Sequence, residues 1–189
     1  MTAPGPRIAI VYYSARGATA RLAEAARAGV ADVALPEMIR IADDDIVRGR
    51  FMDEAALARV DGAAAVLFGS PTFMGGPAAQ FKAFADATSE RWERQAWAGK
   101  AAGGFTCGAC PNGDQSHTLA YFSILAAQHG MLWCNLDLPA GYGAHGLNAM
   151  GAQMGVVAEA ADGVMTRGEI ETAAYLGRRI ADLAIRLSR

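Results

Sequence analysis

Two runs of apolar residues constrain the fold of this chain more than any other feature. The first follows Arg7 and reads I-A-I-V-Y-Y to residue 13, and the second reads A-A-A-V-L-F-G over residues 63–69. Apolar runs without alternating polar residues are typical of strands that are buried on both faces of a parallel sheet. Both runs lead into small and polar residues and then into a helical pattern. We therefore predict a sheet whose strands are connected by helices.

The remaining segments continue this alternation. Helices are predicted from residue 19 to about residue 30, over 53–60, from 77 to about 87, from about 115 to 129, and as a closing amphipathic helix over 170–187. Further strands are predicted within 33–41 and over 100–105 and 131–136, whereas the glycine-rich segment 137–167 predicts no element. Five strands in one short domain favour a doubly wound α/β sheet of order 2-1-3-4-5, with helices on both faces, over a six-stranded dinucleotide-binding sheet.

The composition indicates a single globular domain over residues 1–189. Hydrophobic residues make up 52% of the chain and charged residues 19%, and the formal net charge is -2. This charge gives no electrostatic reason to expect nucleic acid or an anionic membrane as a partner, and no apolar run approaches the roughly 20 residues of a membrane span. The first residues lack the apolar segment of a signal peptide, so we expect a cytoplasmic protein with three reduced cysteines.

The loop after the first predicted strand has the character of an anion site. Residues 14–19 join a buried strand to a helix start, where backbone N–H groups lack partners and the helix dipole favours negative charge. Ser14 and Thr19 add hydroxyl groups, Gly17 permits close backbone approach, and Arg16 can assist. The segment predicts capture of a terminal phosphate, or else an ordinary strand-to-helix turn with a serine N-cap. It is neither G-x-G-x-x-G nor a Walker loop.

Several segments resemble a known family. I-V-Y-Y-S-A-R-G-A-T over residues 10–19, followed by Ala23, resembles the flavodoxin phosphate signature, which expects an aliphatic residue where this chain has Ala26. G-S-P-T-F-M-G-G over 69–76 resembles the G-S-P-T-x-x-G segment of the WrbA-type NAD(P)H:quinone oxidoreductases, the multimeric relatives of flavodoxin. Q-F-K-A-F over 80–84 and H-G-M over 129–131 follow at the family spacing. The resemblance extends over nearly the whole chain.

The resemblance implies a flavodoxin-like fold with one FMN at the carboxyl ends of the strands. It implies three groups of cofactor contacts: Ser14, Ala15, Arg16, Gly17, Ala18 and Thr19 at the phosphate; Pro71, Thr72, Phe73, Met74 and Gly75 along the ring; and Thr106, Cys107, Gly108 and Ala109 around the ribityl chain and ring. It also implies that His129 contacts the flavin site and its substrate, and that Trp92 reaches the site of a neighbouring protomer.

The implied activity is transfer of a hydride from NADPH or NADH to a quinone-type acceptor, by ping-pong chemistry in a homo-oligomer, either a tetramer or a dimer. Because flavin supplies the hydride chemistry, neither an acid–base pair nor a metal is expected from the protein. An alternative is a non-enzymatic electron carrier like short-chain flavodoxins. Such carriers tend to be strongly acidic around the flavin, so the net charge of -2 favours the oxidoreductase. A flavin-binding regulatory module without turnover is a third interpretation.

Two departures from the family pattern leave substrate preference and assembly open. Cys107 and Cys110 replace the usual Ser, Thr or Gly of the fourth loop, and the segment 137–162 is shorter than the family insertion. The two cysteines form a C-x-x-C, which can be a redox pair, but the expected context is a flavin loop with small side chains. His129 could instead cap helix carbonyls, and Trp92 could be an aromatic residue at a helix end.

Overall fold

Strands β1 (Arg7–Tyr13) and β5 (Ala65–Phe73) pair at the centre of a parallel sheet in the computed structural model, which describes residues 5–161 and 163–188. Strand β2 (Leu35–Ile41) pairs with the other edge of β1, and β7 (Ala101–Gly108) pairs with β5. The far edge of β7 is shared by two short strands, β8 (Leu132–Trp133) and β9 (Val156–Glu159). The predicted order 2-1-3-4-5 is confirmed, with its fifth position divided between β8 and β9.

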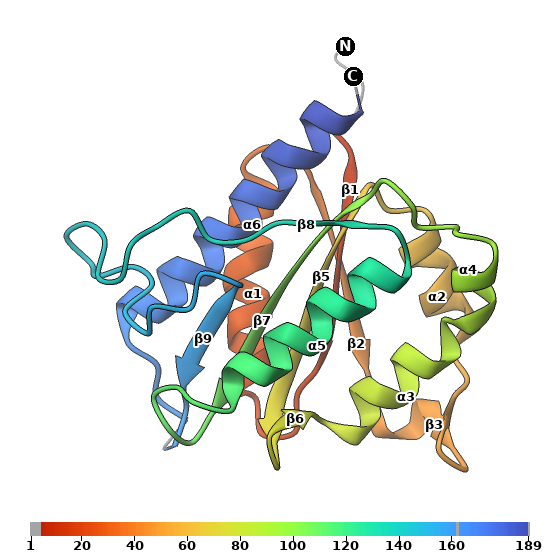
Figure 1. Cartoon of the computed structure of the whole chain (residues 1–189), viewed down its shortest axis with the longest axis horizontal. Helices are drawn as coiled ribbons and strands as arrows, with labels where there is room; N and C mark the ends of the chain where they lie inside the picture. The colour runs from red at the N-terminus through yellow and green to blue at the C-terminus, as the bar shows by residue number, and fades with distance from the viewer. Residues whose placement is uncertain (1–4, 162, 189) are drawn as a thin grey trace.

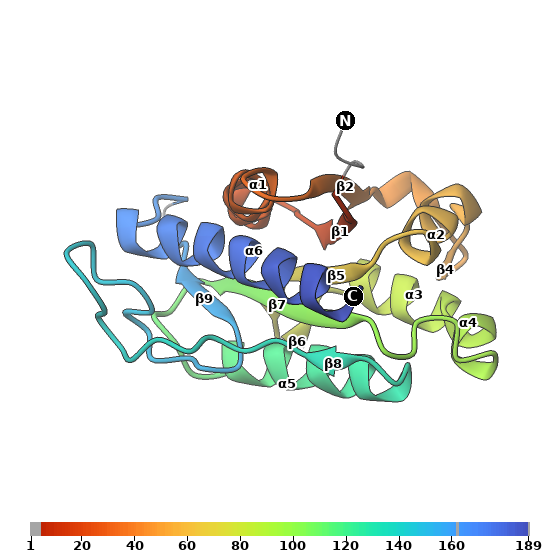
Figure 2. The same ribbon diagram turned by 90° about the horizontal axis from the view of Figure 1, so that it is seen from above.

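Helices cover both faces of the sheet (Figures 1 and 2). Helices α1 (Ala18–Ala31) and α6 (Arg167–Leu187) lie on one face. Helices α2 (Glu54–Asp61), α3 (Ala79–Ala87) and α5 (Gln115–Gln128) lie on the other, and the short α4 (Ser89–Glu93) follows α3. This arrangement confirms the doubly wound α/β class. Within the described residues, no helix combines the length and apolar character that crossing a bilayer requires.

The burial of β1 explains its uninterrupted apolar sequence. Ala9, Val11 and Tyr13 pack into the core beneath α2, α3 and α5. Their neighbours Ile8 and Ile10 point to the opposite face and pack beneath α1 and α6. Side chains of a strand alternate between the two faces of a sheet, so a strand covered on both sides needs apolar residues at every position.

The region after α5 differs from the prediction. A strand was expected over 131–136, but β8 has only two residues, and the chain then leaves the sheet and returns as β9, which the sequence pattern did not predict. The segment between them is organised by the buried side chain of Asn148, whose Nδ2 donates to the Leu138 carbonyl and whose Oδ1 accepts from Ala152 N–H. A short helical turn (Asp43–Asp45) and a hairpin of β3 (Ile46–Val47) and β4 (Arg50–Phe51) were also not predicted.

Helices α1 and α6 pack with their backbones in close approach. A Cβ atom added at Gly29 of α1 would lie 1.9 Å from the Ala174 carbonyl oxygen of α6. In the same way, a Cβ atom at Gly177 of α6 would lie 2.1 Å from the Ala26 carbonyl oxygen of α1. Only glycine fits at these two positions, because the neighbouring atoms belong to backbone and cannot move aside as a flexible side chain can.

Replacing Gly177 with alanine should therefore destabilise the protein. Overpacking of this kind costs about 1–3 kcal/mol, since the helices must separate to admit the methyl group. Gly62, which follows α2 with a φ of -78° and no atom nearer than 3.7 Å to an added Cβ, offers a matched control. Urea unfolding followed by circular dichroism should show a lower midpoint for Gly177→Ala than for Gly62→Ala. Equal midpoints would contradict the close-packing argument.

Candidate functional site

The loop between β1 and α1 is folded around the Ser14 side chain. Ser14 Oγ accepts hydrogen bonds from the backbone N–H groups of Gly17 (3.2 Å) and Ala20 (3.1 Å). Gly17 occupies the N-cap position with a φ of 93°, a left-handed conformation that favours glycine. The serine was expected as a possible N-cap. It instead lies buried beneath the turn and holds the backbone of the loop in place.

The hydrogen-bond donors of this loop suit an anion. A serine hydroxyl has two lone pairs and one proton, and both Ser14 lone pairs are already engaged by N–H groups. Any contact of Ser14 with a ligand therefore uses its O–H as a donor. The N–H groups of Ala18 and Thr19 open helix α1, so they have no acceptor within the helix. A phosphate, with its several acceptor oxygens, matches this set of donors.

A cavity of about 240 Å³ lies against the loop at the carboxyl edge of the sheet. It is lined by Ala15, Arg16, Ala18, Thr19, Pro71, Thr72, Phe73, Cys107, Gly108, Ala109, Ala160 and Ala161. A second depression shares Thr72, Gly108 and Ala109 with this cavity and continues past Met74, Gly75 and Cys110. The structure thus joins the three loops that the sequence singled out into one continuous depression. Its donors at one end and its length beyond Thr72 fit a phosphate-bearing cofactor such as FMN.

The loop after β5 forms a hairpin that projects beside the cavity. Thr72 and Phe73 pair with β6 (Gly76–Pro77), and Met74 and Gly75 form the two-residue turn with φ values of 47° and 81°. Positive φ at both turn positions is favoured in hairpins but is unusual for methionine. Phe73 is 47% exposed and Met74 is fully exposed. The hairpin therefore presents two apolar side chains to solvent next to the depression.

An exposed histidine of helix α5 fastens this hairpin. His117 Nδ1 lies 2.5 Å from the Gly75 carbonyl oxygen and so ties the turn to helix α5. Because a carbonyl only accepts, Nδ1 carries the proton. No local sequence signal links residues 42 positions apart, so this contact needed the structure.

The loop after β7 contributes buried and exposed residues in different ways. Cys107 Sγ lies 3.4 Å from Thr19 Oγ1 at the cavity, and burial raises the pKa of the Cys107 thiol above its ordinary value. Cys110 is exposed in the turn that follows. Thr106 is fully buried and does not line the cavity; its hydroxyl donates to the Ser70 carbonyl at 2.7 Å. Thr106 therefore supports neighbouring groups from beneath the surface.

One wall of the cavity, formed by Ala160 and Ala161 after β9, is not predicted by the sequence pattern. This wall is held by Glu169, a buried residue in the first turn of α6. Its carboxylate accepts from Glu159 N–H at 2.6 Å and from Thr166 N–H at 2.7 Å, which closes the segment between them. The sequence T-R-G-E over residues 166–169 is a capping box that could have predicted where α6 begins.

His129 and Trp92 are not brought to the cavity of their own chain. Helix α5 begins at the edge of the depression and has 14 residues, about 21 Å in length, so His129 at its far end is distant from the loops. The His129 ring is buried against Trp97, and its Nε2 lies 2.8 Å from Thr88 Oγ1. Burial lowers the pKa of His129 below its ordinary value. Trp92 lies on α4 and is 48% exposed.

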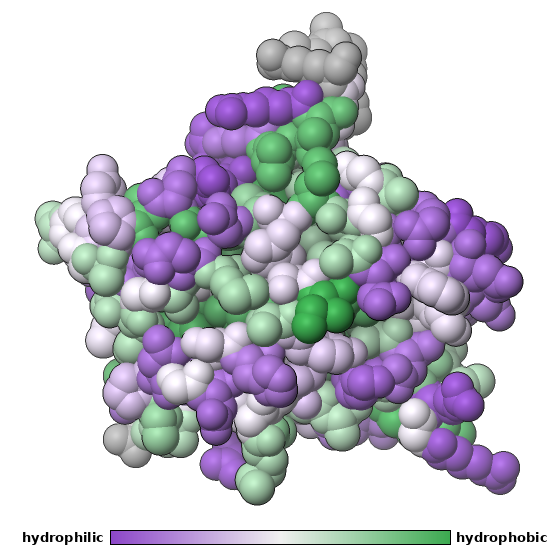
Figure 3. Space-filling model, viewed as in Figure 1, coloured by the Kyte–Doolittle hydropathy of each residue, from purple (hydrophilic) through white to green (hydrophobic). Residues whose placement is uncertain are grey.

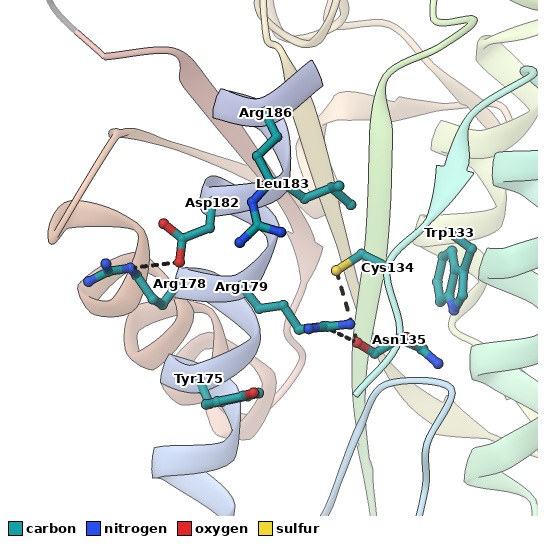
Figure 4. Close-up of a pocket in the computed structure, with 9 residues that line it drawn as sticks. All are labelled: Trp133, Cys134, Asn135, Tyr175, Arg178, Arg179, Asp182, Leu183 and Arg186. Atoms are coloured by element: carbon teal, nitrogen blue, oxygen red, sulfur yellow. Dashed lines mark hydrogen bonds and ion pairs between the residues drawn. The ribbon is translucent and has the colours of Figure 1, made fainter. Parts of the chain in front are cut away.

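Another cavity, of about 250 Å³, lies between α6 and residues 133–135 (Figure 4). Three arginines line it, but the protein already engages two of them. Arg178 pairs with Asp182, and Arg179 donates to the Asn135 carbonyl and pairs with Asp137. This cavity lies between helix α6 and the chain at the end of β8, so it is separate from the three loops at the carboxyl edge of the sheet. We therefore place the functional site at the loop after β1.

The fold and the site define a flavodoxin-like α/β protein with a loop rich in hydrogen-bond donors at the carboxyl edge of its sheet. The profile of the NADPH-dependent FMN reductase family matches residues 6–144. The chain belongs to this family.

Individual relatives agree with the family. Flavodoxin FldP of Pseudomonas aeruginosa (strain UCBPP-PA14) is 37% identical over 186 residues, which cover 94% of this chain and 96% of the relative. An NAD(P)H dehydrogenase (quinone) of Syntrophus aciditrophicus (strain SB) is 30% identical over 201 residues, with 96% and 98% covered. A solved WrbA-like flavodoxin from Agrobacterium tumefaciens has a TM-score of 0.76 and 36% identity, covering 96% of this chain and 99% of the other. The resemblance to WrbA-type flavodoxin-like proteins is confirmed.

Proposed function

We propose that this protein is an FMN-dependent oxidoreductase that passes a hydride from NADPH or NADH to a quinone-type acceptor. The observation that carries the proposal is the donor-rich loop around Ser14 at one end of an open, largely apolar depression. Membership of the NADPH-dependent FMN reductase family supports the cofactor and the reductant. The similarity to NAD(P)H dehydrogenase (quinone) supports the acceptor class. Together they favour turnover over simple electron carriage.

Different residues of the depression would bind different parts of FMN. The loop from Ser14 to Thr19 would hold the phosphate through backbone N–H groups and hydroxyls, with Arg16 adding positive charge at the rim. Thr72, Cys107, Gly108 and Ala109 would contact the ring and the ribityl chain, and Pro71, Phe73, Met74 and Gly75 would form the apolar boundary. When bound, FMN supplies reversible hydride chemistry that the side chains themselves lack.

The open depression allows two substrates to use one place in turn. Phe73 and Met74 stand beside it without closing it, so a nicotinamide ring and then a quinone could pack against the same apolar surface. The side chains at the site would bind and orient the cofactor and substrates, because bound flavin would supply the hydride chemistry. A ping-pong sequence follows from this shared opening.

The first test concerns the phosphate contacts. Thr19→Ala and Ser14→Ala each remove a hydroxyl from the loop, and losing one charge-assisted hydrogen bond of about 1.5–3 kcal/mol weakens FMN binding roughly 10- to 150-fold. Riboflavin lacks the phosphate and should bind both variants about as well as the wild type. Ser123→Ala, a hydroxyl on α5 bonded only to the Ala120 carbonyl, is the control. Fluorescence titrations that give equal FMN affinity for all four proteins would rule out the phosphate assignment.

The second test concerns turnover. With FMN saturating, initial rates of benzoquinone reduction measured at several concentrations of NADPH or NADH should give parallel double-reciprocal lines, as one site used alternately requires. His129→Asn should lower turnover only modestly, because His129 lies at the far end of α5 from the cavity of its own chain, whereas loss of an essential general acid would cost about 100- to 10,000-fold. Loaded protein that reduces no quinone with either nucleotide, yet passes single electrons to a protein acceptor, would establish the carrier. The similarity to flavodoxin FldP makes that outcome worth measuring.

We further propose a homo-oligomer, a dimer or tetramer, that associates through helix α5 and the adjacent strand β8. Residues 115–136 contain no Asp, Glu, Lys or Arg. Ile124 is 59% exposed on the outer side of α5, and Leu132 of β8 is also exposed; Figure 3 shows apolar side chains in the middle of this face. Helix α5 thus carries no charged side chain on any side, and a face without charge can meet its own copy without repulsion.

Trp92 lies at one end of this face, because Gln95 donates both to the Trp92 carbonyl and to the Gln128 carbonyl at the end of α5. Association there would bring Trp92 to a partner chain, as its implied role at a neighbouring protomer's flavin site would require. Ile124→Glu should lower the mass measured by light scattering at micromolar concentration. Met52→Glu, a change at an exposed apolar residue outside α5 and β8, should not. A wild-type mass of about 20 kDa would defeat the proposal.

A further inference from the structure

The side chains beneath Thr72 form a chain of three hydroxyl groups whose direction can be determined. Thr72 Oγ1 lies 2.9 Å from Thr106 Oγ1 and 2.8 Å from Thr118 Oγ1. Thr106 and Thr118 are fully buried, whereas Thr72 reaches the cavity. These three hydrogen-bonded hydroxyl groups therefore connect the interior of the protein with the surface against which a ligand would lie.

Counting protons fixes the direction of each bond. Each threonine hydroxyl has one proton to donate and two lone pairs that can accept. Thr106 donates its proton to the Ser70 carbonyl, which can only accept. The bond between Thr72 and Thr106 must then use the proton of Thr72. The bond between Thr118 and Thr72 must in turn use the proton of Thr118, because that of Thr72 is already engaged.

We infer that Thr72 meets its ligand as a hydrogen-bond acceptor and that Thr106 is the residue that makes it one. Thr72 donates to Thr106 and accepts from Thr118, which leaves one lone pair and no proton for the cavity. A ligand group that bonds there must carry an N–H or O–H. This step rests on the proposed function: the ligand group is then the single imide N–H of the FMN pyrimidine ring. That N–H lies between two carbonyls, to which Thr72 has no proton to donate.

The two buried threonines have different roles in this arrangement. Without Thr106, the proton of Thr72 is released and can turn toward the cavity, where it would donate to a flavin carbonyl. Without Thr118, Thr72 still donates its proton to Thr106, so the lone pairs of Thr72 can still accept from an N–H of the ligand. Thr106 is therefore a positioning residue that sets the polarity of Thr72, whereas Thr118 only adds a bond to it.

The test is an alkaline titration of FMN bound to the full-length protein, followed by the visible absorbance change as the imide N–H ionises. An acceptor stabilises the protonated imide, so loss of a hydrogen bond worth about 0.5–1.5 kcal/mol should raise the ionisation constant roughly 2- to 12-fold. Thr72→Val should show this rise and Thr72→Ser should not. Thr106→Val should show a rise at least as large, and Thr118→Val should remain near the wild type.

The outcomes separate this inference from the proposed function. Protein that binds no FMN contradicts the proposed function. FMN that binds, but ionises identically in the wild type and in Thr72→Val, overturns the acceptor role of Thr72. Equal changes of the imide ionisation constant in Thr106→Val and Thr118→Val would overturn the assigned direction of the hydrogen bonds between the threonines. If Thr106→Val does not fold, Thr72→Val and Thr72→Ser still decide whether Thr72 accepts, through the titration and through FMN affinity at neutral pH.

Discussion

The backbone contact between α1 and α6 is the constraint on which the rest of the site depends. Gly29 and Gly177 let the two helices approach until their carbonyl and Cα atoms meet, which a side chain at either position would prevent. Both helices begin at the carboxyl edge of the sheet, one after the Ser14 loop and the other after the Ala160–Ala161 wall. Arg21 of α1 donates to the Gly163 carbonyl and joins these two starts. Helix packing therefore determines the distance between the donor loop and the opposite wall.

Helix α6 also holds the irregular part of the chain in place. Glu169 closes the segment from Glu159 to Thr166, and Thr172 accepts from Asn148 N–H and so anchors the excursion between β8 and β9. Arg179 fixes the chain where it leaves β8, through the Asn135 carbonyl. The glycine-rich region can thus lack regular structure and still present a defined wall, because helix α6 and the buried side chain of Asn148 supply polar partners for its backbone.

The sequence was sufficient for features that depend on local patterns. The buried strands, the helices with a clear period and the loop from Ser14 to Thr19 can be read from residues that are neighbours in the chain. By contrast, β9 has only four residues and is defined by its pairing with β7. The wall at Ala160 is held in part by the Glu169 carboxylate, which accepts from the N–H groups of Glu159 and Thr166 on either side of it. The hydrogen bond from His117 to the Gly75 carbonyl likewise cannot be predicted from the sequence pattern, because the two residues are distant in the chain. The family resemblance identified His129 and Trp92 but could not place them relative to the cavity of one chain.

The two ends of the depression differ in hydrogen-bonding character, and this difference gives a bound cofactor its direction. The loop after β1 offers N–H groups and a serine proton, which suit an anion better than another donor. At Thr72 the hydroxyl chain leaves only a lone pair, so the Thr72 side chain offers no donor to the same anion. Phe73 and Met74 beyond Thr72 offer neither donor nor acceptor from their side chains except the weak thioether sulfur. On the proposed function, a molecule with a phosphate at one end and a ring N–H at the other would be favoured in one orientation, because reversal would place the phosphate against the Thr72 lone pair and the ring N–H against the donors of the loop after β1.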